Sequence, residues 1–455
     1  MLAKFKKKYI GDWDFYQKYL LLAIPMILQN AITNLVSFLD NIMVGQLGTE
    51  QMSGVAIVNQ LIFVYNLAIF GAVSAASIFG AQYFGKGNHK GHMYSFRFKL
   101  YATLLVTGGA ILLFLTKGSA LISLYLTDTV GNGATDLALQ YGLEYLAIMM
   151  VGLIPFAVNQ SYATNIKETG QTFIPMLASF VAVGTNAILD YLMIFGIGPF
   201  PELGVQGAAL ATVIARYIEA LIVVIWAHIH RGKNRYLEGA YTGFGIPLAE
   251  LKAILIKGFP LMMNEVLWAA GMTTVTQCYS VRGLDVVAGL NIASTITNLF
   301  NIVYLQLGSC ISIVVGQYLG AGKLEDAKDA DNKMIVFSVF CCVIMAALMF
   351  VVGGFFPGIY NTTEEIRELA TSFIAVSAII MPFCAFSHAS YFTLRSGGKT
   401  VVTFLFDSVF TWVIVVPAAY LLAHFTGLGI VSIYFLVQGT ELIKVIDQHP
   451  HRHRR

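Results

Sequence analysis

The chain alternates between long apolar stretches and short polar segments from one end to the other. Most of the apolar stretches reach the roughly 20 residues that a helix needs to cross the hydrocarbon core of a bilayer. Turn signals and charges divide the chain into twelve predicted transmembrane helices, at 17–43, 52–83, 93–116, 137–159, 172–196, 205–229, 250–279, 285–316, 331–357, 366–393, 400–424 and 427–447. Internal prolines mark the positions where we expect these helices to bend: Pro25, Pro155, Pro260, Pro382 and Pro417.

Composition supports this all-α integral membrane fold. Of the 455 residues, 57% are hydrophobic and 12% are charged, and the mean hydropathy is +0.71. Soluble domains carry roughly 25% charged residues, so this chain has too little charge to cover a surface in water. The net charge of +3, from 28 basic and 25 acidic residues, is too even to suggest a nucleic-acid partner.

The five cysteines indicate neither a disulfide framework nor a metal centre. Their number is odd, all lie in apolar stretches, and their spacing does not match that of metal ligands. We interpret them as buried packing residues and expect no cofactor. They are Cys278, Cys310, Cys341, Cys342 and Cys384.

Basic residues are distributed unevenly over the loops between the predicted helices. With the N-terminus in the cytoplasm, the outer side carries only Lys117, Arg282 and Arg367. Apart from Arg216 inside a predicted helix, the remaining basic residues fall on the inner side, including those at both ends of the chain: Lys4, Lys6, Lys7, Lys8, Arg452, Arg454 and Arg455. Because cytoplasmic loops carry an excess of Lys and Arg, both termini are expected to be cytoplasmic.

The two halves of the chain resemble each other. Pairing Pro25 with Pro260, an offset of 235, keeps the register without a gap as far as Gly87 and Gly322. We therefore predict two six-helix lobes, residues 1–235 and 236–455, related by a pseudo-twofold axis along the membrane normal. Two such bundles around a cleft are suited to alternating access, although a duplicated scaffold without a transport role has the same pattern.

Several motifs resemble those of the MATE (multidrug and toxic compound extrusion) family. The run Pro25-Met-Ile-Leu-Gln-Asn30 with Asp40-Asn-Ile-Met-Val-Gly-Gln-Leu-Gly48 is similar to its first helix. Gly316-Gln-Tyr-Leu-Gly-Ala-Gly322 and Gly80-Ala-Gln-Tyr-Phe-Gly-Lys-Gly87 resemble its repeated inner loop, and Gly204-Val-Gln-Gly-Ala-Ala-Leu-Ala-Thr212 the start of its sixth helix. The resemblance implies a two-lobed, bacterial-type exporter of organic, often cationic, compounds, driven by inward proton or sodium flow.

Four oxygen-bearing side chains lie at similar depth in the predicted helices of the first half: Asp40, Asn186, Asp190 and Thr212. Asn186 and Asp190 are four residues apart, so they share a helix face. Oxygen ligands suit Na⁺, and a carboxyl group in a dry cavity can bind a proton instead. The resemblance implies that the four residues form the cation site of the N-terminal lobe. The alternative is a buried hydrogen-bond network between helices.

The second half lacks these acids, because Asp40 aligns with Val275 and Asp190 with Ala418. The ion chemistry is therefore expected to be asymmetric. Six further side chains are candidates for lining a substrate cleft: Gln29, Asn30, Asn34, Asn159, Glu265 and Trp268.

Other polar groups in or near the predicted helices have simpler interpretations. Asp407 could pair with Lys399 or face a vestibule, and Arg216 could pair with Glu219. Glu144 and Glu441 are expected to reach the membrane interface, and His388 to form a hydrogen bond between helices or to relay protons. Seven histidines are expected at solvated or headgroup-facing positions: His89, His92, His228, His230, His449, His451 and His453.

We therefore expect a monomeric secondary active antiporter in the cell membrane, in contact with membrane lipids, with small organic substrates and no nucleic-acid partner. A phosphate-binding Walker motif, a zinc helix, a catalytic serine elbow and a CxxC pair are absent from the sequence. The alternatives are a lipid-linked oligosaccharide flippase of the same wider superfamily, a membrane-embedded enzyme, and a channel.

Overall fold

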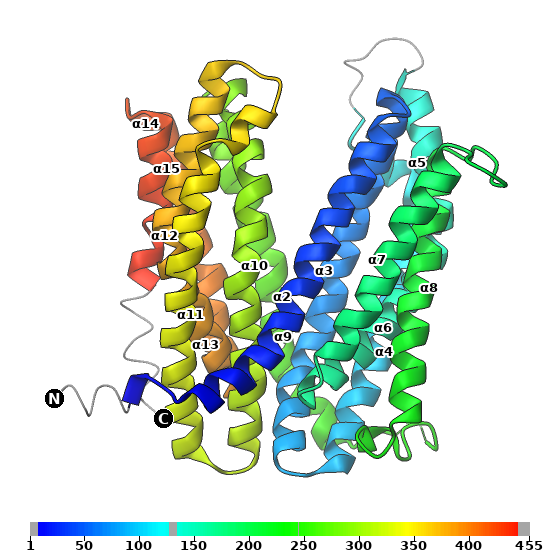
Figure 1. Ribbon diagram of the computed structural model, residues 1–455, viewed down its shortest axis with the longest axis vertical. Coiled ribbons are helices and arrows are strands. Elements are labelled where there is room, and N and C mark those ends of the chain that lie inside the picture. Colours follow the sequence, from blue (N-terminus) through cyan, green and yellow to red (C-terminus); the bar gives the residue numbers. More distant parts are fainter. Residues whose placement is uncertain (1–7, 127–133, 244, 445–455) are drawn as a thin grey trace. The chain divides into compact units, whose positions relative to one another are not determined.

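The computed structural model describes residues 8–126, 134–243 and 245–444, apart from the side chains of Phe38 and Ala134. Within these residues the chain is helical and contains no β-strand (Figure 1). Ten of the helices are long and apolar enough to cross a membrane, and a bent helix pair makes an eleventh span. The charged terminal residues discussed above lie outside the described residues, except for Lys8: Lys4, Lys6, Lys7, His449, His451, Arg452, His453, Arg454 and Arg455.

The first half of the chain forms seven helices, at positions close to those predicted. They are α2 (Trp13–Gly45), α3 (Thr49–Gly85), α4 (His89–Ser123), α5 (Ala134–Val151), α6 (Leu153–Glu168), α7 (Phe173–Ile194) and α8 (Val205–Ile229). The predicted fourth span is a pair of helices, α5 and α6, which meet at Gly152 with a bend of 44°. Pro155 follows this break by three residues and cannot donate a backbone hydrogen bond, which is consistent with a bend there.

The second half begins with four long helices and ends with shorter ones. They are α9 (Leu248–Ser280), α10 (Leu284–Gly320), α11 (Leu324–Gly353), α12 (Glu364–Ser396), α13 (Thr400–Phe404), α14 (Val416–Phe425) and α15 (Ile430–Gln438). Two π-helical segments, η3 (Leu405–Val409) and η4 (Thr411–Val415), join α13 to α14 as one apolar helix of 26 residues. The predicted twelfth span corresponds to α15 and a helical turn at 441–444, where the described residues end.

The chain forms two compact units. Unit 1 comprises Met1–Ile27, Ala81–Gly87 and Leu255–Arg455, and unit 2 comprises Leu28–Gly80 and Asn88–Ile254. In unit 2, α7 packs along α8, and α5 and α6 also contact α8. In unit 1, α10, α11 and α12 pack together, and α12 contacts α15. The division into lobes at 1–235 and 236–455 remains a prediction.

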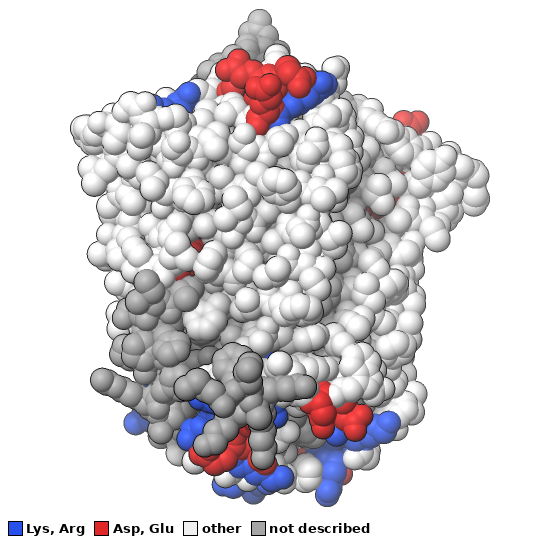
Figure 2. All heavy atoms as spheres, turned by 60° about the vertical axis from the view of Figure 1, so that its left-hand side comes forward, with Lys and Arg blue, Asp and Glu red and all other residues white. Residues whose placement is uncertain are grey.

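Each unit has its own apolar core. In unit 2 the largest cluster joins α3, α5, α6 and α8 through buried side chains that include Ile69, Leu146, Leu153 and Ala209. In unit 1 a corresponding cluster joins α9, α10, α11 and α12 and includes Phe373 and Met349. Many large apolar side chains nevertheless face outward. On the face shown in Figure 2, charged residues gather at the two ends and the surface between them is almost free of charge, as a lipid-facing band requires.

The internal repeat is visible in the helix bounds. Helices α2 and α9 both have 33 residues, α3 and α10 both have 37, and each pair is related by the offset of 235 found in the sequence. Near the ends of α3 and α10, the repeated motifs contact each other reciprocally. A Cβ atom on Gly85 would lie 2.0 Å from the carbonyl oxygen of Gln317, and one on Gly320 would lie 1.9 Å from that of Gln82. Glycine is therefore required at both positions, because backbone atoms cannot move aside as a side chain can.

Candidate functional site

Two carboxyl groups meet in unit 2. Asp40 projects from α2, near its end at Gly45, and Asp190 from α7, near its end at Ile194. Asp190 is 1% exposed, Asp40 is half-buried, and the two side chains interact directly. Neither oxygen of Asp190 forms a hydrogen bond of ordinary geometry with a described residue, and one oxygen of Asp40 also lacks such a bond. Buried carboxyl oxygens without a donor are costly, and a proton or a cation between the two groups would lower that cost.

Asn186 and Thr212 complete the predicted group of four. Asn186 lies one turn before Asp190 on α7, is 6% exposed, and acts on the Asp190 carboxyl. Its Nδ2 atom donates to Thr212 Oγ1 on α8 over 3.4 Å. Three helices, α2, α7 and α8, thus bring together the four side chains that the sequence pattern singled out. Their role in ion binding remains a prediction.

A tyrosine that the sequence analysis did not single out also belongs to this group. Tyr145 on α5 is 5% exposed, and the carboxyl groups of Asp40 and Asp190 act on its hydroxyl. That hydroxyl donates to Asn59 Oδ1 over 3.3 Å. An aromatic residue in an apolar helix gives no sequence signal for such a position, because most of these residues pack against neighbouring helices.

The four cleft candidates of unit 2 lie in different environments. Gln29 Nε2 donates to Ser179 Oγ over 2.7 Å, and Ser179 in turn donates to Glu219. Asn34 is exposed and donates to the Asn30 carbonyl oxygen over 3.0 Å. Asn159 is 3% exposed, and its Oδ1 atom has no hydrogen-bond partner among the described residues.

Arg216 and Glu219 on α8 form their hydrogen bonds with different partners. Arg216 donates to the Gly152 carbonyl oxygen over 3.4 Å and lies 5.1 Å from the centre of the Phe156 ring. Glu219 accepts from Ser179. The guanidinium group is therefore placed at the bend between α5 and α6, at a carbonyl oxygen that also accepts the backbone N–H of Phe156.

The two remaining cleft candidates belong to unit 1. Trp268 is 40% exposed on α9, and Glu265 lies one turn earlier on the same helix. Charges on Arg395 and Asp407 act on the Glu265 carboxyl. Whether these two residues share a cleft with those of unit 2 remains a prediction.

A buried ion pair in unit 2 corrects one expectation. Lys99 Nζ lies 2.5 Å from Glu168 Oε1 and donates to Asn165 Oδ1 over 2.8 Å. His92 Nε2 lies 3.4 Å from the other Glu168 oxygen. His92 is only 2% exposed, so its predicted solvated position is wrong. The basic residues near His92 in the sequence suggest a turn that faces water. His92 instead belongs to a long helix, and such a helix packs one face against its neighbours even where the surrounding sequence is polar.

Of the two interpretations of Asp407, the pairing with Lys399 is wrong. Asp407 lies 3.6 Å from Lys444 Nζ, and Lys444 also lies 2.8 Å from Glu441. The difference arises because the turn at 441–444 packs against the helix that carries Asp407. The position of Glu441 at the membrane interface remains a prediction.

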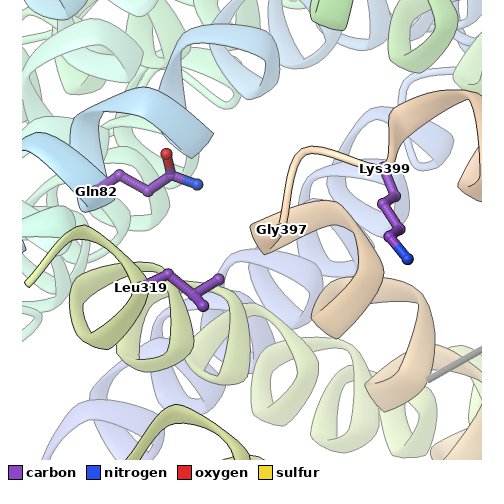
Figure 3. A pocket seen from close by; sticks show the side chains of 4 residues that line it. All are labelled: Gln82, Leu319, Gly397 and Lys399. Carbon is purple, nitrogen blue, oxygen red and sulfur yellow. The ribbon is translucent and has the colours of Figure 1, made fainter. Parts of the chain in front are cut away.

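A small cavity in unit 1 lies where the repeated loop motifs converge. Figure 3 shows Gln82 and Leu319 beside the turn that carries Gly397 and Lys399. The cavity has a volume of about 310 Å³, and Gln82 Nε2 donates to the Ser396 carbonyl oxygen over 2.7 Å. None of the predicted ion-site or cleft residues lines it.

Known proteins that are similar to this chain show its family. The chain is 23% identical to a probable multidrug resistance protein NorM of Thermotoga maritima, over 90% of this chain and 86% of the relative. It is 24% identical to a probable multidrug resistance protein NorM of Halalkalibacterium halodurans, over 90% of this chain and 88% of the relative.

The fold is similar to that of a solved multidrug resistance MATE family transporter of the MOP superfamily, described in an outward-facing conformation. The TM-score is 0.85 at 19% identity, over 97% of this chain and 95% of the other. This similarity confirms the predicted all-α transmembrane fold. The sequence model of the MatE family matches residues 25–192 and 260–421, which together make up most of the chain. The chain therefore belongs to the MatE family of membrane transporters.

Proposed function

We propose that this transporter exports small organic compounds from the cell in exchange for an inward flow of H⁺ or Na⁺. The observation that carries the proposal is the direct interaction of Asp40 and Asp190, three of whose carboxyl oxygens are buried without a hydrogen bond of ordinary geometry to a described residue. Two interacting carboxylates in a buried site repel each other unless a proton or a cation lies between them. The pocket therefore changes its charge and hydrogen bonding each time an ion binds or leaves.

The relatives named multidrug resistance proteins support an organic substrate rather than a lipid-linked oligosaccharide. The membrane location follows from the apolar spans and the family. We propose that the chain acts as a monomer among membrane lipids, with both termini in the cytoplasm. In this orientation the Asp40 and Asp190 ends of α2 and α7 face outward, where external cations can reach them.

The proposed cycle couples this pocket to the shape of α2. An external ion binds between the two carboxyl groups, with Asn186, Thr212 and Tyr145 around them. The bound ion offsets one of the two negative charges and so weakens the repulsion between the Asp40 carboxyl group on α2 and the Asp190 carboxyl group on α7. Helix α2 then bends at Pro25, where the backbone lacks a hydrogen-bond donor, and substrate leaves to the outside. Release of the ion to the inside returns the pocket to its charged state.

Efflux from proteoliposomes under separately imposed gradients tests this proposal. Loaded vesicles containing the wild-type protein should release an organic cation when either a proton or a sodium gradient is applied, and the effective gradient identifies the coupling ion. Asp40→Asn should abolish the release, because an amide cannot gain or lose the charge. The matched control is Asp329→Asn, which removes a half-exposed carboxylate that pairs with Lys333. Undiminished gradient-driven release by Asp40→Asn would refute the coupling site.

A further inference from the structure

Three polar side chains form a hydrogen-bonded chain across α2, α7 and α8 in unit 2. Gln29 Nε2 donates to Ser179 Oγ over 2.7 Å, and the Ser179 hydroxyl donates to Glu219 Oε1. Ser179 is 4% exposed, and Gln29 and Glu219 are half-buried. The same three helices carry the predicted ion site, so the two groups can be compared helix by helix.

The contact between α2 and α7 has the same register in both groups. Gln29 and Ser179 are 150 residues apart in the sequence. Asp40 and Asp190 have the same separation and also interact. Each residue of the first pair precedes its counterpart by eleven residues, which is about three helical turns. Both pairs therefore lie on the same faces of α2 and α7.

The contacts between α7 and α8 show the same relation. Asn186 donates to Thr212 in the predicted ion site, and Ser179 donates to Glu219 in the chain. Ser179 comes seven residues before Asn186, and Glu219 comes seven residues after Thr212. Residues seven apart share a helix face. The three helices thus present polar side chains at two levels, and the second level lies toward the Pro25 end of α2.

The direction of the hydrogen bonds leaves one oxygen at the second level without a donor. A carboxylate can only accept, so the single hydrogen of the Ser179 hydroxyl goes to Glu219. Ser179 then accepts from the Gln29 amide, which places Nε2 toward Ser179. The Gln29 Oε1 atom is buried and has no hydrogen-bond partner among the described residues. A buried acceptor without a donor is unfavourable, and a cation beside it would lower that cost.

Two hydroxyl groups lie between the two levels on α2. Thr33 Oγ1 donates to the Gln29 carbonyl oxygen over 2.8 Å, and Ser37 Oγ to the Thr33 carbonyl oxygen over 3.0 Å. Because the hydroxyl hydrogens are used, the two oxygens can only accept further contacts. Four polar residues follow one another along this face of α2 at spacings of four, four and three residues: Gln29, Thr33, Ser37 and Asp40. The face is a stripe of oxygen-bearing side chains that joins the two levels.

The chain itself contains one charge, that of Glu219. Helix α7 and the part of α2 in unit 2 contain no lysine, arginine or histidine. The nearest cation on α8 is Arg216, whose charge acts on Glu219. Its guanidinium group is directed elsewhere, because it donates to the Gly152 carbonyl oxygen and packs on the Phe156 ring. A single monovalent cation would therefore match the charge of Glu219.

We propose that Gln29 Oε1, Ser179 Oγ and a carboxylate oxygen of Glu219 form a second cation site in unit 2, which binds one Na⁺ ion. Oxygen ligands suit a hard cation, and the site has the same helices and register as the Asp40 level. The ion reaches it along the stripe on α2. This route and the use of the site during transport rest on the proposed antiport function, whereas the binding of Na⁺ does not.

Binding of ²²Na⁺ to the full-length protein in nanodiscs, with choline holding the ionic strength constant, tests the site. Asp40→Asn/Asp190→Asn removes both acids of the other level and should still bind one Na⁺ ion. In that background, Glu219→Gln should abolish the binding, and Ser179→Ala should weaken it by about tenfold. Gln29→Glu adds a carboxylate and should strengthen it by about tenfold. A purely structural hydrogen-bond chain would show no Na⁺ binding that these changes move in opposite directions.

Two control variants should leave Na⁺ binding unchanged. Glu238→Gln removes an exposed carboxylate of unit 2 that pairs with Arg235. Thr185→Val removes a hydroxyl on α7 that bonds within its own helix. If Glu219→Gln fails to fold, Gln29→Met replaces it, removes the unpartnered oxygen and should weaken binding by about tenfold. Undiminished binding in Glu219→Gln, or a double aspartate variant that binds no Na⁺, would overturn the proposal.

Efflux measurements separate this inference from the proposed function. Wild-type protein that transports nothing under any gradient, yet binds Na⁺ through Glu219, would refute the antiport function and leave the second site standing. Normal gradient-driven efflux by a protein that binds no Na⁺ at Glu219 would have the reverse meaning.

Discussion

The two acidic groups of this protein differ in what surrounds the carboxylates. In unit 2, Asp40 and Asp190 interact with each other. The groups around them are the Asn186 amide, the Thr212 hydroxyl and the Tyr145 phenol. In unit 1, Asp407 and Glu441 share the ammonium group of Lys444. The first group has no ammonium or guanidinium partner of this kind, whereas in the second group Lys444 offsets one of the two negative charges. The comparison teaches that a resident lysine offsets part of the charge of an acidic pair, whereas a pair without one depends on a proton or a cation from outside.

The largest expected effect comes from removing a carboxylate of the uncompensated pair. Asp190→Asn should reduce gradient-driven efflux to the level of protein-free vesicles, because no other described acid completes the pocket with Asp40. Expression and thermal unfolding should change little, since the substitution removes a repulsion rather than a bond. Retained efflux would mean that Asp190 is not needed for coupling.

The next largest effect is expected for the buried Lys99–Glu168 ion pair of unit 2. Like the group of Asp407, Glu441 and Lys444 in unit 1, this pair contains a lysine. Lys99→Met should destabilise the protein by about 3 to 5 kcal/mol, because it leaves the Glu168 carboxylate without its cation. The measurement is the free energy of unfolding in detergent. Adding Glu168→Gln should recover most of the loss, and failure to do so would mean that Lys99 acts through packing.

A smaller effect is expected at Lys444, whose carboxylate partners remain partly exposed to water. Lys444→Gln should lower the free energy of unfolding by about 1 to 2 kcal/mol, less than a fully buried pair, because water partly screens the two acids. Glu441→Gln in the same chain should restore stability. Equal losses in the free energy of unfolding for Lys99→Met and Lys444→Gln would show that burial does not set the cost of removing the lysine.

The smallest effect is expected at Thr212, where only one long hydrogen bond is lost. Thr212→Val should cost about 0.6 kcal/mol, the typical value for hydrogen bonds between membrane helices. A fall in the apparent affinity for Na⁺ but not for H⁺ would identify the hydroxyl as a ligand of the metal ion. An equal fall for both would indicate a structural role.

Much of the fold could be predicted from the sequence. The apolar stretches located the helices to within a few residues for most spans, as for Val205–Ile229, whose bounds match those expected. The break at Gly152 and the π-helical segments around Asp407 could not be predicted, because both arise from how one helix packs against others. The four residues of the predicted ion site were singled out from their depth, a shared helix face and the family resemblance, and their role remains a prediction, whereas Tyr145 gave no signal.

The sequence by itself determined which segments are helical and apolar, where the repeat lies, and that Asn186 and Asp190 share one face. These properties follow from periodicity and composition, which act locally along the chain. Only the tertiary structure decided which partner each charge has: Lys444 rather than Lys399 for Asp407, and Glu168 for Lys99 and His92. The physical reason is that a buried charge takes its partner from whichever helix packs nearest, and that choice depends on side-chain packing between segments far apart in the chain.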